Sequence, residues 1–306
     1  MSRTRLILLF SILILVVVFF KTNSVQQTAK EESLVPNVIH FALLKEDNIT
    51  ETKLEFIGAT CILAAFLNQD PEKVVIHTNV KIINGRYFNI VKSVIPSEKL
   101  EIRFEQRPTH VYGYPLSSLY HSADVLRIST LLHNGGIFLD LDTFIVRPLN
   151  IFFINECTIG WPKGQNIGTQ IVIAKPKSRF LSLWLKSYKD YRASMWYYNA
   201  GEAPTKEILN KDPNLVNRIT ELFGVHNLAK ELYDKSNWKN WTNYYSIHLL
   251  SGHRNYLVPL DVKESGIVQF DEFNIQFYKK PFGEIARSIW NNPLIKKHWE
   301  SKPMIE

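Results

Sequence analysis

Short apolar runs and longer stretches with helical spacing alternate along most of the chain. The runs Val38–Leu43 and Lys73–Thr78 are bounded by polar or turn residues and predict β-strands. Amphipathic stretches at 51–68 and 119–132 predict α-helices. Further short elements are expected at 87–94, 100–104 and 171–174. Strands that alternate with helices indicate an α/β fold with a mostly parallel, doubly wound sheet, in which ligands bind at the carboxyl ends of the strands.

The segment 122–149 stands out because its apolar strand is interrupted by acids. A helix-like portion runs through Gly135-Gly136 into an apolar run that contains Asp140-Leu141-Asp142. In an extended segment residues i and i+2 share a face, so the two carboxylates would point to one place and repel each other. Buried, unpaired charge is costly, and a hard divalent ion that also binds phosphate oxygens would compensate it. Taken alone, the triplet fits a surface turn with two solvated acids better than a metal site.

The residues before the triplet favour the metal site. Asp124 and Arg127 in an S-x-D-x-x-R run, followed by G-G-x-aromatic-x-D-x-D, resemble the sugar-binding region of the D-x-D glycosyltransferases of family 32. That family includes α1,4-galactosyltransferases and α1,4-N-acetylglucosaminyltransferases of animals and α1,6-mannosyltransferases of fungi. The chain departs from the pattern at Ala123, an inserted residue, and at Phe138, where relatives often have Tyr. The resemblance implies a GT-A-like fold, one catalytic domain and retention of the anomeric configuration.

The resemblance also implies roles for the donor-binding residues. Asp142 would hold a divalent cation, and Asp140 would reach it directly or through water while contacting the donor. Asp124 and Arg127, three apart on one helical face, would contact the donor sugar; the alternative is an ordinary helix-surface ion pair. Two further pairs are donor-site candidates: His40 and Phe41 of the opening strand, and Gln165 and Asn166 of a polar loop. In relatives this loop faces donor and acceptor; the alternative is an ordinary loop.

A third metal ligand is expected late in the chain. His248 lies in a short apolar run and resembles the C-terminal histidine that completes the cation site of many GT-A enzymes. Imidazole together with carboxylates favours Mn²⁺ over Mg²⁺ or Ca²⁺. His253 is the substitute, and His226 has no supporting context.

One or two members of an aromatic cluster are expected to stack on sugar rings, and the rest to pack in the core. The cluster comprises Trp184, Tyr188, Tyr191, Trp196, Tyr197 and Tyr198.

Composition agrees with one catalytic domain. The chain has 306 residues, 45% hydrophobic and 12% aromatic, enough for a large core. Its formal charge of +7 comes from scattered Lys and Arg residues rather than from basic runs, which argues against nucleic acid as a partner. A mild basic bias suits anionic donors or membrane surfaces.

The N-terminal sequence predicts a membrane location. Residues 1–5 form a basic cytosolic tail, residues 6–20 an apolar helix, residues 21–34 a stem and residues 35–306 the luminal domain. The apolar run would span about 22 Å, which fits a cleaved signal peptide or a short signal anchor. Because no small-x-small cleavage site follows, we predict an uncleaved anchor, and the preceding positive charge makes this a type II protein of the Golgi membrane.

A luminal domain would be open to N-glycosylation and to disulfide formation. Asn48 and Asn240 begin N-glycosylation sequons. Cys61 and Cys157 would form one disulfide bridge or remain buried free thiols, and the sequence leaves both possibilities open.

The sequence thus predicts a metal-dependent glycosyltransferase that moves a hexose or N-acetylhexosamine from a UDP-sugar to a galactose-ended glycan on lipid or protein. One alternative is a GDP-mannose-dependent mannosyltransferase, and another is a non-catalytic glycan-binding protein on the same fold. A calcium-binding module is disfavoured because the chain lacks the Gly-punctuated acidic loop of such sites. No carboxylate nucleophile is assigned.

Overall fold

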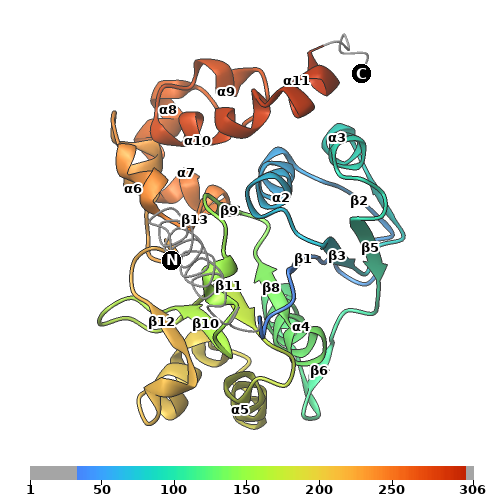
Figure 1. Ribbon diagram of the computed structural model, residues 1–306, viewed down its shortest axis with the longest axis vertical. Coiled ribbons are helices and arrows are strands. Elements are labelled where there is room, and N and C mark those ends of the chain that lie inside the picture. The colour runs from blue at the N-terminus through green and yellow to red at the C-terminus, as the bar shows by residue number, and fades with distance from the viewer. Residues whose placement is uncertain (1–32, 301–306) are drawn as a thin grey trace, which may run out of the picture. The chain divides into compact units, whose positions relative to one another are not determined.

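The computed structural model describes residues 33–300 (Figure 1). The predicted tail and anchor, and most of the predicted stem, lie outside the described residues, so they stay predictions. Within residues 33–300, no helix has both the length and the apolar character needed to cross a membrane.

A seven-stranded sheet in the order β12-β10-β11-β8-β1-β3-β5 forms the centre of the domain. β1 pairs in parallel with β3 and β8, β3 with β5, and β10 with β12, whereas β11 runs antiparallel to both of its neighbours. The mostly parallel, doubly wound sheet predicted from the sequence is confirmed. Its strands are β1 (Val38–Leu43), β3 (Lys73–Thr78), β5 (Leu100–Phe104), β8 (Gly136–Leu139), β10 (Cys157–Gly160), β11 (Gly168–Ala174) and β12 (Asn217–Ile219).

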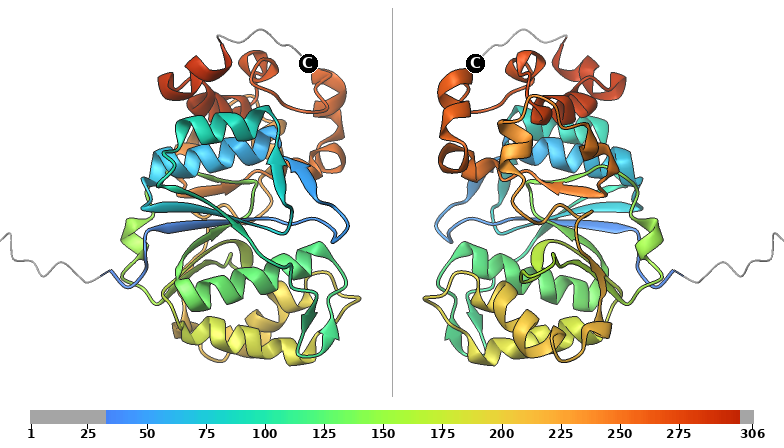
Figure 2. Two further views of the ribbon diagram at one scale, coloured as in Figure 1. Left: turned by 90° about the vertical axis from the view of Figure 1, so that its right-hand side faces the viewer. Right: turned by 90° about the vertical axis from the view of Figure 1, so that its left-hand side faces the viewer.

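Helices cover both faces of this sheet (Figure 2). In β1, Ile39 and Phe41 pack into one core, and His40 between them points to the opposite face. The first face is covered by α2 (Phe56–Gln69), α3 (Arg86–Val94) and the C-terminal helices, and the second by α4 (Leu119–Asn134) and α5 (Arg179–Ser187). Because both faces are buried, the central strands are almost continuously apolar.

The two cysteines lie in different cores. Cys61 on α2 is fully buried in the core on the first face, and Cys157 at the start of β10 is buried in the core on the second face. Both are free thiols. The disulfide bridge that the sequence left open is therefore not formed, because the sheet separates the two side chains.

Two predicted elements differ from the structure. The helix expected at 51–68 begins only at Phe56, because Glu51–Lys53 forms strand β2, which pairs in parallel with β4 (Ile82–Asn84). The acidic triplet is a turn instead of an extended strand: the N–H of Thr143 donates to the carbonyl oxygen of Asp140 at 2.9 Å. The chain then continues into β9 (Thr143–Ile145).

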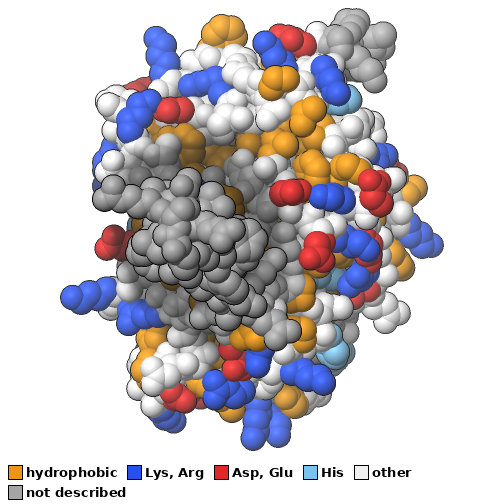
Figure 3. Space-filling view, in the orientation of Figure 1, with side chains coloured by type: hydrophobic (Ala, Val, Ile, Leu, Met, Phe, Trp, Pro, Cys, Tyr) orange, Lys and Arg blue, Asp and Glu red, His pale blue; other side chains and the backbone are white. Residues whose placement is uncertain are grey.

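Between β12 and residue 300, the chain forms short helices and one strand. The strand β13 (Ser246–His248) pairs antiparallel with β9. The helices are α6 (Ala229–Tyr233), α7 (Arg254–Leu257), α8 (Pro259–Ser265), α9 (Asn274–Phe277), α10 (Pro281–Trp290) and α11 (Pro293–Trp299). On the face seen in Figure 3, basic and acidic side chains are interspersed over this part and over the rest of the surface.

Candidate active site

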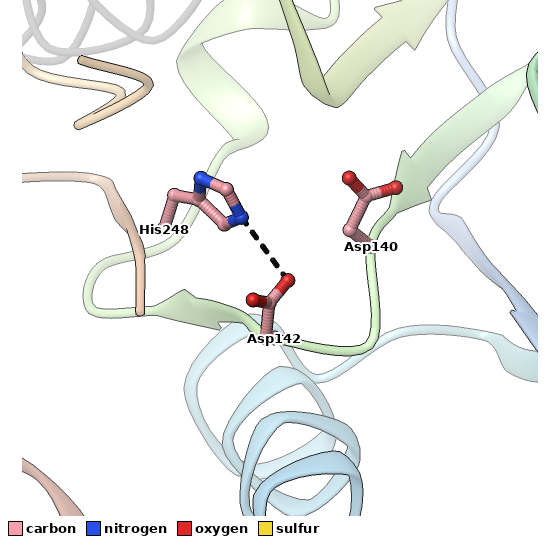
Figure 4. A group of neighbouring side chains, drawn as sticks. All are labelled: Asp140, Asp142 and His248. Atoms are coloured by element: carbon pink, nitrogen blue, oxygen red, sulfur yellow. Dashed lines mark ion pairs between the residues drawn. The ribbon is translucent and has the colours of Figure 1, made fainter. Parts of the chain in front are cut away.

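The three predicted metal ligands lie together. Asp140 and Asp142 occupy the turn between β8 and β9, and His248 ends β13, where it pairs with Thr143. One ligand atom from each lies within 4.8 Å of those of the other two. Figure 4 shows the three side chains pointing toward one another. Two carboxylates and an imidazole at this spacing suit a divalent ion of the manganese type.

Backbone hydrogen bonds hold the acidic turn in place. The N–H of Asp140 and the hydroxyl of Thr143 both donate to the carbonyl oxygen of Gln170 on β11, at 3.0 and 3.1 Å. The N–H of Leu249 donates to the carbonyl oxygen of Asp142 at 2.8 Å. The turn is thus fixed to the sheet on one side and to β13 on the other.

Asp142 and His248 form a polarised pair. The imidazole Nε2 of His248 lies 3.2 Å from Oδ1 of Asp142. Burial raises the pKa of the Asp142 carboxyl, but the His248 charge and hydrogen bond outweigh it, so the pKa falls below its ordinary value. Burial conversely lowers the pKa of His248, and Asp142 more than offsets this, so that pKa rises. Each group therefore favours the charged form of the other.

Arg127 joins the helix α4 to the acidic turn. Its Nη1 donates to Oδ1 of Asp124 at 2.6 Å, and its Nη2 donates to Asp140. The guanidinium lies over the ring of Phe138, 5.3 Å from the centroid. Arg127 is 3% exposed and Asp124 8%, so the alternative of a surface ion pair is wrong.

Two features leave this pair open to a ligand. The Nε of Arg127 is buried and has no hydrogen-bond partner among the described residues. Burial raises the pKa of Asp124 to about 6, although Arg127 opposes that rise. The N–H at Nε of Arg127 can therefore donate to a ligand hydroxyl, and the carboxyl group of Asp124 can accept from it.

A cavity of about 480 Å³ opens beside these side chains. It lies at the carboxyl ends of β1 and β8, which is where ligands bind in doubly wound α/β sheets. Among the predicted residues it is lined by Asp124, Arg127, Asp140, Asp142, His248 and His253. The sequence interpretation missed other parts of its wall, chiefly Ala42, Leu44, Tyr120, Thr169 and Gln170. The rule that ligands bind beyond strand ends could have indicated Ala42 and Leu44, which end or follow β1.

His40 and Phe41 are not placed as predicted. Phe41 is fully buried in the core on the α2 side of the sheet. His40 is 1% exposed, and its Nε2 bonds the carbonyl oxygen of Gly135 at 3.1 Å while its Nδ1 bonds Nε2 of His77 at 3.0 Å. Neither residue lines the cavity, because both side chains are buried in the interior on the two faces of the sheet. The prediction that they contact the donor is therefore wrong, and both residues have a structural role.

Gln165 and Asn166 line a second, adjoining hollow instead of the first cavity. His226 lines neither of them. Of the aromatic cluster, Trp196 and Tyr197 line both hollows, whereas Trp184 and Tyr188 are buried in the core.

Comparison with known proteins points to one kind of enzyme. Residues 60–159 match the family model described as the glycosyltransferase sugar-binding region containing the DXD motif. This range includes Asp124, Arg127 and the acidic turn. Glucan organizing enzyme 1 of Cryptococcus neoformans is 24% identical over 208 residues, which cover 64% of this chain and 55% of that protein. The chain thus aligns with about half the length of this relative.

Similar solved structures include two that are named as glycosyltransferases and one that is named as a galactosyltransferase. PaToxG glycosyltransferase has a TM-score of 0.41 and 14% identity, covering 82% of this chain and 86% of that one. The glycosyltransferase GlyE of Streptococcus pneumoniae has a TM-score of 0.49 and 9% identity, covering 87% and 63%. The galactosyltransferase LgtC, solved with donor and acceptor sugar analogues, has a TM-score of 0.38 and 12% identity, covering 84% and 97%.

The sheet order and the acidic turn beside a histidine make the fold GT-A-like. Residues 60–159 of this chain are similar to the DXD-containing sugar-binding region of glycosyltransferases.

Proposed function

We propose that the protein is a metal-dependent, retaining glycosyltransferase that moves a hexose or N-acetylhexosamine from a UDP-sugar to the terminal sugar of a glycan. The observation that supports this most is the convergence of Asp140, Asp142 and His248 at the cavity that also holds Asp124 and Arg127. A divalent cation bound there would act as a Lewis acid on the departing diphosphate.

The chain's own residues would orient the donor. Arg127 holds Asp140 and Asp124 in fixed positions, and the hydroxyls of the donor sugar would bond to Asp124 and to the free Nε of Arg127. In the overall transfer, the acceptor hydroxyl oxygen bonds to the anomeric carbon as the bond from that carbon to the diphosphate breaks. The diphosphate leaves with the bonding electron pair, and the hydroxyl proton passes to a leaving-group oxygen or to solvent.

We propose UDP as the nucleotide and a galactose-ended glycolipid or glycoprotein as the acceptor, on the resemblance to the animal enzymes. GDP-mannose is the alternative donor, since fungal members of the resembled family use it. The name of the fungal relative refers to glucan, so UDP-glucose belongs among the donors to be tested.

We further propose that the enzyme is a type II protein of the Golgi membrane with a luminal catalytic domain. The exposed sequons at Asn48 and Asn240 provide a test of this address. Expression in animal cells should yield a protein whose mass falls on treatment with an N-glycosidase, and Asn48→Gln with Asn240→Gln should remove that shift. An unshifted protein would contradict the luminal address.

The proposed activity is tested with the purified full-length chain in detergent. Sugar transfer and donor hydrolysis are measured for UDP-glucose, UDP-galactose, both UDP-N-acetylhexosamines and GDP-mannose, with Mn²⁺ and with a chelator. We expect the activity with one of the UDP-sugars to need the metal. Asp142→Ala should lower it at least about a hundredfold, because the loss of a cation ligand typically costs that much or more.

The exposed acid Asp212, outside both hollows, provides the matched control: Asp212→Ala should leave the activity unchanged. Activity that survives Asp142→Ala or the chelator would disprove the metal assignment. Glycan binding without turnover of any donor would favour the non-catalytic alternative.

A further inference from the structure

The second hollow adjoins the first cavity. It measures about 320 Å³ and shares five lining residues with its neighbour: Gln170, Trp196, Tyr197, His248 and His253. His248, a predicted metal ligand, therefore lies at the boundary between the two spaces. A molecule in the second hollow would lie directly beside a donor held in the first.

The two spaces differ in charge. The first is lined by Asp124, Arg127, Asp140 and Asp142. No carboxylate, lysine or arginine lines the second, which has the amides Gln165, Asn166 and Gln170 together with aromatic rings and two imidazoles. Amides bond neutral hydroxyls as donors and as acceptors, and they offer no charge to neutralise a carboxylate. The second hollow is thus suited to an uncharged, hydroxyl-rich molecule.

Gln170 provides an unused acceptor at the junction. Its side-chain oxygen is buried and has no hydrogen-bond partner within the described part of the chain. Its backbone is fixed, because its carbonyl oxygen accepts from Asp140 and Thr143. Space for the amide is left by Gly168, where a Cβ would come within 2.6 Å of the Gln170 oxygen. Buried polar atoms of native proteins are nearly always bonded, so a ligand hydroxyl is the natural partner.

Trp196 provides an apolar platform over both spaces. Trp196 is 60% exposed, and its ring meets that of Tyr120, itself 63% exposed, edge to face at 4.9 Å between centroids. The carbonyl oxygen of Trp196 bonds Nε2 of His121 at 3.0 Å, which anchors the backbone beneath the exposed ring. A large, well-anchored aromatic ring left in water beside a polar hollow suits the C–H face of a pyranose.

We propose that the second hollow is the acceptor subsite and that it selects a neutral pyranose, which stacks on Trp196 and donates a hydroxyl hydrogen bond to Gln170. Acidic sugars are selected against, because their carboxylate would find no lysine or arginine there. It would also lie near the carboxylate of Asp142, which already pairs with His248 at the boundary. This inference rests on the proposed function, which it deepens by assigning the acceptor's place and chemical class.

The kinetic test compares transfer with donor hydrolysis in the full-length chain. The acceptors are methyl β-galactopyranoside and methyl β-galacturonoside, which differ only in the carboxylate at C6. We expect the uronoside to have at least about a tenfold lower kcat/KM. Trp196→Ala should lower kcat/KM for the galactoside at least about tenfold more than it lowers donor hydrolysis. Trp196→Phe should restore most of the loss because it keeps a ring.

Gln170→Leu should raise KM for the galactoside more than it lowers kcat. Leucine is similar in size to glutamine but offers the acceptor hydroxyl no hydrogen bond. Phe277→Ala removes an aromatic ring that is 83% exposed and lies outside both hollows, and it should change neither rate. Equal rates with the two acceptors, or equal losses of transfer and hydrolysis in Trp196→Ala, would overturn the proposal.

A binding measurement separates this proposal from the proposed function. Saturation-transfer NMR with UDP, Mn²⁺ and methyl β-galactopyranoside should show contact with the wild-type chain, loss in Trp196→Ala and retention in Trp196→Phe. An enzyme that hydrolyses no donor but still gives this pattern refutes the proposed function alone. Absence of contact in the wild-type chain, or contact unchanged in Trp196→Ala, refutes the acceptor subsite.

Discussion

At the scale of single residues, Arg127 connects the helix α4 to the acidic turn of the proposed donor site. Its guanidinium bonds both Asp124 and Asp140 in a buried setting. A planar fork with several donors can serve two carboxylates at once, which the single ammonium group of lysine does poorly. The motif spacing in the sequence predicted that Asp124 and Arg127 share a helical face; their burial and the bond to Asp140 came from the fold.

Arg127→Ala should destabilise the protein by about 3–5 kcal/mol, because it leaves a buried carboxylate without its partner. Urea unfolding measures this loss. The control is Arg179→Ala, which breaks an ion pair with Glu156 whose arginine side chain is 69% exposed. The control should cost less than about 1 kcal/mol. Equal losses in the two variants would contradict the burial argument.

His40 makes stability depend on pH. Burial is the main cause that lowers its pKa to about 3, with His77 contributing in the same direction. Between about 3 and the ordinary value of 6.5, the unfolded chain therefore binds more protons at this site than the folded chain. The stabilisation is complete above pH 6.5 and is lost progressively as the pH falls toward 3.

The prediction is that His40→Phe, which keeps a ring against Phe138, flattens the fall in unfolding free energy between pH 6 and pH 4. The slope should decrease by up to about 1.4 kcal/mol per pH unit. Urea unfolding at a series of pH values measures it, with the exposed His133→Asn as the control. A slope unchanged by His40→Phe would mean that His40 does not resist protonation in the folded state.

At the scale of elements, Gly135 after α4 and Gly136 at the start of β8 let the acidic turn form where it does. Gly136 has a φ of +108°, and a Cβ there would lie 2.5 Å from the carbonyl oxygen of Val38 on β1. Only glycine fits this close approach between a helix end and two paired strands. The Gly-Gly pair, visible in the sequence as a turn signal, is thus required by the contact of β8 with β1.

Gly136→Ala should destabilise the protein by more than about 1 kcal/mol, since backbone strain and the steric contact add together. Gly113 separates the two causes: its φ is +87°, but a Cβ there would meet nothing within 4 Å. Thermal unfolding should therefore show a smaller loss for Gly113→Ala. If Gly113→Ala lost as much stability as Gly136→Ala, the contact with Val38 would contribute nothing to the loss.

At the scale of the whole molecule, the sheet divides the interior into two cores and keeps the cysteines apart. Burial raises the pKa of both thiols, so neither is reactive in the folded protein. We predict that a thiol reagent labels no cysteine under native conditions and both Cys61 and Cys157 in denaturant without reductant. Failure to label either one in denaturant would reveal a disulfide bridge.

The sequence by itself determined the features that depend on neighbours along the chain. These are the alternation of strands and helices, the helix that presents Asp124 and Arg127, and the two acids at the end of a buried strand; periodicity records such local structure directly. The turn that the acidic triplet forms was not predicted. It also indicated His248 as a metal ligand, through resemblance and not through any local signal.

Only the tertiary structure decided which distant segments meet. It paired β13 with β9 and so brought His248 to Asp142, and it enclosed His40 and Phe41 within β1. It turned residues 51–53 into a strand by supplying β4 as a partner, and it joined the loop of Gln165 and Asn166 to Trp196 in a second hollow. The physical reason is that strand pairing and burial are set by partners far away in the chain, which no local pattern encodes.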